Sequence, residues 1–441
     1  MSHTPDTTVQ VPTLRVVTRH LQHPGVLTEW ISPRNPLVFM RRGQGLVGRG
    51  PSITQSFTGT NRIHQASAWW SEVVGNADID DAVGIPGSGL VAFGAMSFSD
   101  SSRQASVLVI PRTIIGVLGT TAWRTDITVH GDTPKTGSNE NTNTNTNPDT
   151  DLSTDTTAIT TLSPTPPTPL SPVSWQTGLV SEDDFIGMVK KTLDHLSLGH
   201  ADKVVLARDL VARSPYGADW RQAIQRLSDR YPDTHTFAID GLVGASPETL
   251  VSLHHNTLRT RVLAGSRARG GSEREDQHAA DELYRSSKDL DEHRFAVHSV
   301  VEALKTLTSH VAADELPFTL KLPNLWHLAT DIAATLPPGK TGLDAVAALH
   351  PTAAVAGSPT TQALEIINTL EPFDRGRYAG PVGWVDHRGD GEWAIALRCA
   401  QWSEDGTITA YAGAGIVPGS DPESELLETG LKFQPIIDAF S

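Results

Sequence analysis

The pattern of hydrophobic and polar positions changes twice along the chain and divides it into four parts. Short apolar runs broken by Gly and Pro fill residues 25–131, a pattern typical of β-strands. Residues 132–173 are mainly Asn, Thr, Asp, Pro and Ser, and cannot bury enough apolar surface to offset the entropy of ordering. We therefore expect a weakly ordered, flexible lead-in over 1–24, a β-rich part over 25–131, a disordered insertion over 132–173 and a larger domain over 174–441.

Helical and strand patterns are mixed irregularly within residues 174–441. A helix is expected after Ser181, which is followed by acids in the first turn, an apolar face and a Gly stop. Residues 221–230 also favour a helix, and residues 324–336 form an apparently isolated strand. Because there is no regular βαβ alternation, we expect an α/β (α+β) fold, with a large, mainly antiparallel β-sheet sandwich flanked by helices.

Composition narrows the classes of function. The net charge of −15 argues against nucleic-acid binding and against binding to anionic membranes. No apolar run approaches the roughly 18 residues of a membrane span, and the first ten residues lack a signal-peptide core. Cys399 is the only cysteine, which suits a reducing compartment. We expect a cytoplasmic protein that acts on a small molecule.

Two pairs of acids have helical spacing. Asp289 and Glu292 are three residues apart in one expected helix, and Glu425 and Glu428 are three apart in another, so each pair shares a helix face. Two acidic faces brought together would repel unless a cation lay between them, and carboxylate oxygens with water suit Mg²⁺. Each pair taken alone is equally compatible with a solvated helix face.

A lysine and a glutamate stand beside apolar strands. Lys203 begins the strand pattern KVVLARDLVAR, and Glu248 follows Ser246 and Pro247 in a turn. Most lysines at a strand end reach water, and most turn glutamates are structural. A lowered lysine pKa would allow Lys203 to act as a base, opposite Glu248 as an acid.

Arg398 lies in the strand AIALRCA, which is too apolar for an unpaired charge. It needs a carboxylate partner from the protein or from a ligand. Gly413, Gly415 and the Gly265–Ser266 turn would let backbone N–H groups approach an anion. None of these stretches matches a phosphate-binding motif.

The assembled motifs resemble the chorismate-utilising enzymes, the family of anthranilate synthase component I, and most closely the isochorismate synthases. The resemblance covers about residues 175–441 and is weaker in the amino half. It is carried, in order, by KVVLAR, GASPETLV, LAGSRARG, KDLDEHR, LWHLATDI, ALHPTAAVAGSP, RGRYAGPVGWVD, GDGEWAIALRCA and AGAGIVPGSDPESELLETGLK. It implies the chorismate-binding-enzyme fold, with 174–441 as the chorismate-binding catalytic domain.

The resemblance also implies roles for matching positions. Lys203 would activate water to attack C2 of chorismate, and Glu248 would protonate the departing C4 hydroxyl. Mg²⁺ would bind Glu292 and Glu428 and the ring carboxylate of chorismate, with Asp289 and Glu425 behind these ligands. The remaining substrate contacts would be Gly265, Ser266 and His327 along the ring, and Tyr378, Arg398, Gly413 and Lys432 on the enolpyruvyl carboxylate side.

Within the family, the residues favour isochorismate synthase, a hydroxymutase-type isomerase. Aminodeoxychorismate synthases carry a lysine where this chain has Ala264, and anthranilate synthases lack the base at the position of Lys203. Salicylate synthases share Lys203 and Glu248 and are harder to exclude, but Ala354 and Val355 resemble the isochorismate type of loop. The other class of hypothesis is a catalytically silent binding protein.

The same resemblance sets expectations about partners and pathway. Water as nucleophile requires no glutaminase subunit, and we expect a monomer. The product would feed menaquinone or siderophore biosynthesis, and the residues do not choose between the two.

Overall fold

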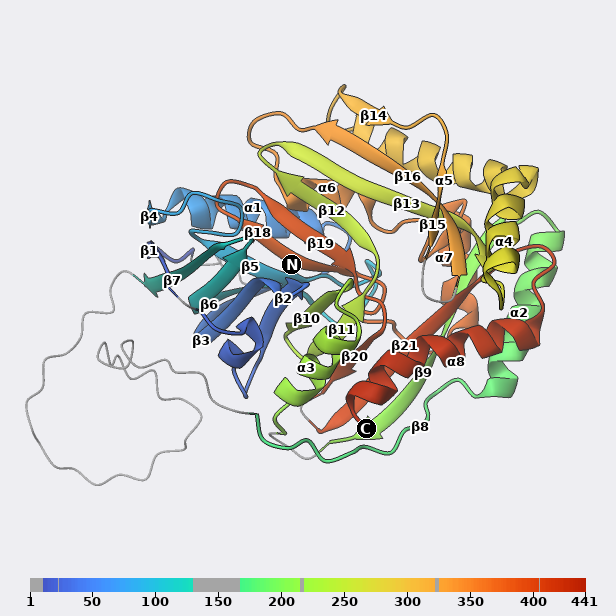
Figure 1. The fold of residues 1–441 in the computed structure, drawn as a ribbon, viewed down its shortest axis with the longest axis horizontal. Coiled ribbons are helices and arrows are strands. Elements are labelled where there is room, and N and C mark those ends of the chain that lie inside the picture. The colour runs from blue at the N-terminus through green and yellow to red at the C-terminus, as the bar shows by residue number, and fades with distance from the viewer. Residues whose placement is uncertain (1–10, 23, 130–166, 215–217, 322–324, 404) are drawn as a thin grey trace, which may run out of the picture.

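Two β-layers that share one strand form the framework of the protein (Figure 1). The computed structural model describes residues 11–22, 24–129, 167–214, 218–321, 325–403 and 405–441. Strand β6 (Ser106–Leu118) pairs along its length with β3 (Gln44–Phe57), and its first residues also pair with β5 (Val91–Ala95). The two layers diverge from this branch point.

Each layer continues through hydrogen-bonded neighbours. From β3 the first layer runs through β2 (Leu37–Arg41), β10 (His235–Ile239), β11 (Leu242–Ser246), β20 (Cys399–Trp402), β21 (Thr407–Ile416) and β9 (Lys203–Arg213). From β5 the second layer runs through β18 (Pro381–Asp386), β19 (Gly391–Ile395), β12 (Thr249–His254), β13 (Thr257–Ala268) and β16 (Leu325–Thr335). Short strands border these layers: β1 (Leu14–His20), β4 (Asp78–Asp81), β7 (Thr121–Val129), β8 (Gln176–Thr177), β14 (Val311–Ala313), β15 (Phe318–Lys321) and β17 (Gly357–Ser358).

The strand pairs of the described residues are antiparallel except for β1 with β4. This confirms the expected mixed fold with a large, mainly antiparallel sheet. The pairing of β2 with β10 and of β5 with β18 joins residues 25–131 to residues 174–441 in one β-structure.

Helices cover the outer faces of the layers. In Figure 1, α8 crosses the first layer over β21 and β9, while α4 and α5 lie over β13 and β16 of the second. The helices are η1 (Leu27–Trp30, a 3₁₀ turn), α1 (Arg62–Gly75), α2 (Glu182–Ser197), α3 (Arg221–Arg230), α4 (Glu273–Arg285), α5 (Ser287–Lys305), α6 (Gly342–Leu349), α7 (Thr360–Leu370) and α8 (Pro422–Ala439). No helix in the described part of the chain is long and apolar enough to cross a membrane.

The alternation of side chains along β9 and β21 decides what faces the interior. Val204 and Leu206 point outward into a core shared with α2 and α7. Lys203 and Val205 therefore point to the opposite face, between the two layers. Apolar side chains from both layers fill most of that space, including Phe39, Phe237, Val251, Ile332 and Trp393.

Helix starts follow their capping signals. Ser181 accepts a hydrogen bond from the backbone N–H of Asp184, whose carboxylate accepts one from the Ser181 N–H, so α2 begins with the expected capping box. Helix α3 spans 221–230 as predicted.

Three expectations about order and pairing need correction. Residues 14–20 of the expected lead-in form β1, because Leu14 and Val16 bury one face against β4 and β7. Within the expected insertion, Leu170 is buried and Val173 donates a backbone hydrogen bond to Phe440, so this end packs on the protein; residues 130–166 lie outside the described residues. Strand β16 is not isolated, since it pairs with β13, β14 and β15.

Candidate active site

A large cleft of about 1930 Å³ opens between the two layers, beneath α8 and beside the start of α5. It brings together predicted residues that are far apart in the sequence. The cleft is lined by Lys203, Glu248, Gly265, Asp289, His327, Tyr378, Arg398, Gly413, Glu425, Glu428 and Lys432. Ser266 lies opposite His327 in the β13–β16 pair, and Glu292 lies in α5; the side chains of these two residues are outside the described part.

Lys203 projects from the first residue of β9 across the neighbouring strand β21. An ideal Cβ placed on Gly415 would lie 2.9 Å from the lysine Cε and 3.6 Å from its Nζ. The missing side chain at position 415 therefore provides the path along which the lysine reaches the cleft. Strand pairing on both sides of β9 fixes its backbone, with Ser358 opposite Lys203 on one side and Ile416 opposite Val204 on the other.

Glu248 lies between β11 and β12, where the chain passes from the first layer to the second. Its backbone is fixed at both ends, since its N–H donates to the Ser246 hydroxyl and its carbonyl accepts from the N–H of Ile395. Burial raises the pKa of the carboxyl, and the positive charges of Lys203, Lys432 and Arg398 only partly oppose this rise. The carboxyl therefore keeps its proton to higher pH than an ordinary glutamate.

Arg398 is half-buried and adopts a positive φ of 49° between β19 and β20. Its carbonyl accepts a hydrogen bond from Ala245, which ties this bend to β11. Among the described residues, no carboxylate lies within ion-pair distance of the Arg398 guanidinium. Burial lowers the pKa of Arg398, and the negative charges of Glu428 and Glu248 only partly oppose this fall. An anionic ligand in the cleft would supply the missing bidentate partner.

Tyr378 and Lys432 flank Gly413 on β21. Tyr378 is buried and stacks on Tyr411 at 5.2 Å between ring centroids, and its hydroxyl lies 3.0 Å from the position of a Cβ on Gly413. Lys432 donates to the carbonyl of Gly413 at 2.8 Å and forms an ion pair with Glu428 at 2.5 Å. A side chain at position 413 would therefore close the space between these two polar groups.

The acids of α8 and α5 face the cleft from two sides. Burial raises the pKa of Glu425, and the neighbouring charge of Glu428 raises it further. Asp289 sits in the first turn of α5, where its N–H donates to the capping hydroxyl of Ser286. No three His, Cys, Asp or Glu side chains within the described ranges are grouped to hold a metal. Of the two predicted Mg²⁺ ligands, Glu428 lines the cleft and forms an ion pair with Lys432, and the side chain of Glu292 lies outside the described part, so the Mg²⁺ site stays a prediction. Mg²⁺ often takes only one or two protein carboxylates, and a carboxylate such as that of Glu428 has the oxygen ligands that suit it.

His327 and Gly265 form the wall contributed by the second layer. Gly265 has a positive φ of 76° at a bulge between Ala264 and Ser266, and its missing Cβ leaves room for Asp289. The Nδ1 atom of His327 lies 3.4 Å from the carbonyl of Gly265. Burial lowers the pKa of His327, so its imidazole is mainly neutral near pH 7.

One family model covers almost the whole chain. The family model described as "Chorismate binding enzyme" matches residues 15–441. The chain belongs to the chorismate-binding enzyme family.

Individual relatives lie within the same family. Isochorismate synthase DhbC of Bacillus subtilis is 40% identical over 269 residues, which cover 58% of this chain and 67% of that protein. Isochorismate synthase MenF of B. subtilis is 34% identical over 264 residues, which are 59% of this chain but only 56% of that protein. The crystal structure of DhbC from Bacillus anthracis superposes with a TM-score of 0.70 at 28% identity, covering 94% of this chain and 98% of that one.

The structure also reveals cleft residues of this chorismate-binding enzyme that the sequence had not singled out. Val205 and Tyr411 line the cleft because they alternate with outward-facing residues on β9 and β21. Arg375 lines it from the segment that follows α7. The period-two pattern could have indicated the first two residues, whereas nothing local marks the third.

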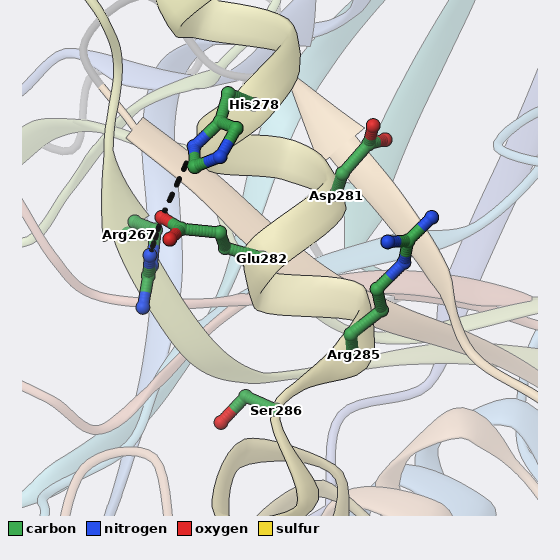
Figure 2. Close-up of a pocket in the computed structure, with 6 residues that line it drawn as sticks. All are labelled: Arg267, His278, Asp281, Glu282, Arg285 and Ser286. Carbon is green, nitrogen blue, oxygen red and sulfur yellow. Dashed lines mark hydrogen bonds and ion pairs between the residues drawn. The ribbon is translucent and has the colours of Figure 1, made fainter.

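A second, smaller hollow of about 310 Å³ lies on the outer face, between β13 and α4 (Figure 2). Arg267 forms an ion pair with Glu282, and Nδ1 of His278 lies 3.5 Å from the Glu282 carboxylate. These side chains are 39–72% exposed, and charges so well solvated contribute little to binding or stability. The large cleft, and not this hollow, is therefore the candidate active site of this family member.

Proposed function

We propose that this enzyme is an isochorismate synthase. It would convert chorismate to isochorismate by adding water at C2 and losing the hydroxyl at C4. The observation that carries the proposal is that Lys203 and Glu248, the implied base and acid, line one cleft that also holds Arg398 with no ion-paired carboxylate among the described residues. The identity with isochorismate synthases of B. subtilis supports the same reaction.

The reaction requires one proton to be removed and one to be delivered. The amine of Lys203 accepts a proton from water as the water oxygen bonds to C2, and the ring double bonds shift. The C4–O bond breaks in the same shift of electrons, and the carboxyl of Glu248 protonates the departing hydroxyl, so a water molecule leaves. The raised pKa of Glu248 supports this role, because a general acid must hold its proton at the working pH.

The substrate is a dianion, and the local charges of the cleft would bind it. Arg398 is suited to one carboxylate, on the side lined by Tyr378 and Gly413. Glu428, Glu292, Asp289 and Glu425 would hold Mg²⁺ directly or through water. When bound, the ion would neutralise the ring carboxylate that these acids would otherwise repel.

Product analysis tests the proposal. Purified protein is incubated with chorismate and Mg²⁺, with and without ammonium, and the products are separated by chromatography. Isochorismate alone, in equilibrium with chorismate and abolished by EDTA, is the expected result. Lys203→Ala should lose water addition while still binding chorismate, and Lys190→Ala on the exposed face of α2 is the matched lysine control.

Other products would redirect the assignment. Salicylate with pyruvate would indicate a salicylate synthase and draw attention to Ala354 and Val355, which line the cleft. Anthranilate formed only with ammonium would contradict the role of Lys203. The absence of any conversion would favour a binding protein.

A further inference from the structure

The strand that carries Lys203 has a gap along its outer edge. On one side β9 is fully paired with β21, but on the other side residues 203–204 pair with β17 and residues 210–211 pair with β8. Between these pairs, the N–H of Val205 donates to the carbonyl of Ala356 and the carbonyl of Asp209 accepts from the N–H of Gly178. No strand of the described chain lies against the Val205 carbonyl and the Ala207 N–H, which stand between them. Buried backbone N–H and C=O groups need partners, so this gap has to be filled by other groups.

The side chains of Glu371 and Arg375 fill the gap. The backbone N–H of Ala207 donates to Oε1 of Glu371 at 2.8 Å, and the carbonyl of Val205 accepts from Nη2 of Arg375 at 2.7 Å. One side chain thus supplies the acceptor and the other the donor that a neighbouring strand would provide. The two also bind each other, with Nε to Oε2 at 2.8 Å and Nη2 to Oε1 at 2.6 Å.

Arg375 also joins β9 to the loop that precedes β17. Its Nη1 donates to the carbonyl of Val355 at 2.9 Å, next to Ala356, whose carbonyl accepts from the N–H of Val205 on β9. Its backbone carbonyl accepts from the N–H of Tyr378 at 3.0 Å in a tight turn. The guanidinium stacks over the ring of Phe98 at 4.5 Å, which fixes its plane.

Packing alone would be served as well by apolar side chains. The side chains of Arg375 and Glu371 are only 3% and 2% exposed, and the desolvation cost of such a pair can exceed its Coulombic gain. The pair makes side-chain bonds that apolar groups cannot make, to β9 and to the loop at Val355. A further strand at this place would bring its own side chains against the cleft wall.

We propose that Glu371 and Arg375 are a positioning pair that takes the place of a missing strand along β9. The pair holds the backbone that carries Lys203 in register with the Val355 loop and with Tyr378. The proposal rests on the proposed function, because it assumes that Lys203 is the base. Errors of about 1 Å in such a position can cost roughly 100-fold in rate.

The experiment compares three full-length variants with the wild type. Arg375→Met keeps the length but removes the fork, Glu371→Gln keeps the shape but removes the charge, and Arg221→Met removes another buried arginine that pairs with Asp219 away from the cleft. Measured quantities are the melting temperature, kcat and KM for chorismate, the pH profile of kcat, and backbone hydrogen–deuterium exchange by mass spectrometry.

The expected result separates positioning from stability. Arg375→Met and Glu371→Gln should lower kcat by roughly 10- to 100-fold with KM changed less than about threefold, and should alter the pH profile of kcat. Exchange should rise in residues 203–209 and 352–358. Arg221→Met should lower the melting temperature while leaving kcat and the pH profile unchanged.

Each other outcome has a defined meaning. Folded pair variants with wild-type kcat and pH profile would overturn the proposal even if exchange rose, because the pair would then be only structural. If the wild type does not convert chorismate, the proposed function fails. The exchange data would then still test the positioning: a rise confined to the two segments supports it, and unchanged exchange overturns it. If Arg375→Met does not fold, the isosteric Glu371→Gln variant provides the same comparison.

Discussion

Replacing Gly415 with alanine should impair the reaction through the position of Lys203. The new Cβ would lie 2.9 Å from Cε of the lysine, whereas ordinary contacts begin near 3.4 Å and extend to 4 Å. The lysine chain must therefore move by about 0.5 to 1 Å. No left-handed backbone angle is recorded at position 415, so the substitution adds contact without backbone strain.

The displacement can be converted into an expected rate. A 1 Å error in a reacting group costs roughly 100-fold, so we expect kcat to fall by about 10- to 100-fold. This corresponds to about 1.4 to 2.7 kcal/mol in the activation free energy. The contact is the far end of a flexible side chain, so the free energy of unfolding should change by less than about 1 kcal/mol. KM should change little, because the chorismate contacts are untouched.

Alanine substitutions at two other glycines serve as comparisons for Gly415→Ala. In Gly413→Ala the Cβ would lie 2.7 Å from the carbonyl of Leu206 and 3.0 Å from the hydroxyl of Tyr378, so KM should rise and stability should fall by roughly 1–3 kcal/mol. Gly430 of α8 has nothing within 4 Å, and Gly430→Ala should leave kinetics unchanged and stabilise by about 1 kcal/mol. The assay is the initial rate of isochorismate formation against chorismate concentration. A folded Gly415→Ala enzyme with wild-type kcat would refute the role assigned to Lys203 or the path assigned to its side chain.

Three further predictions concern the charges of the cleft. Glu428→Gln should raise the Mg²⁺ concentration needed for half-maximal rate at least tenfold, measured by metal titration after EDTA treatment; an unchanged requirement would remove Glu428 from the metal site. Arg398→Lys should raise KM for chorismate roughly tenfold with a smaller change in kcat, because a lysine cannot reproduce the bidentate fork, and an unaltered KM would contradict the carboxylate contact. The pKa values of Glu248 and Glu425 are raised in the folded protein, so the folded protein binds more protons than the unfolded chain at intermediate pH. The contribution of these two carboxyl groups to the free energy of unfolding is therefore complete below their ordinary pKa and is lost as the pH rises through their folded pKa values. Without metal, the melting temperature of Glu248→Gln should therefore fall less than that of the wild type as the pH is raised from about 4.5, and identical curves would exclude this linkage.

The sequence predicted the helices whose first and last residues are marked by capping residues and apolar periodicity. Helix α2 begins at the expected capping serine, and α3 occupies the expected residues, because caps and apolar periodicity act within a few residues. Strand β1 escaped prediction because its partners, β4 and β7, lie about 60 and 110 residues away. Its stability comes from those distant strands and from burial of Leu14 and Val16, not from its composition.

The candidate site likewise contains residues that the local sequence marks and residues that it does not mark. Lys203, Glu248 and Arg398 could be singled out because each is a charge beside apolar sequence, and the structure places all three on one cleft. Arg375 could not, since a Glu and an Arg four residues apart usually form a solvated helix pair. Only the unfilled edge of β9 shows why this pair is buried. Such a gap is a property of the sheet topology and has no local signal.

The distribution of charge explains how an acidic protein could hold an acidic substrate. The net charge of −15 would repel a dianion at a distance, so binding must depend on charges that are close and poorly screened. The positive charges of Arg398 and Lys432 act on the pKa of Glu248, so these two cations lie near one carboxyl inside the cleft. The burial that raises the pKa of Glu248 also strengthens the attraction of those cations for a bound carboxylate. Desolvation of the cleft therefore serves the acid and the substrate contacts together, and a substitution that opens the cleft to water should weaken both at once.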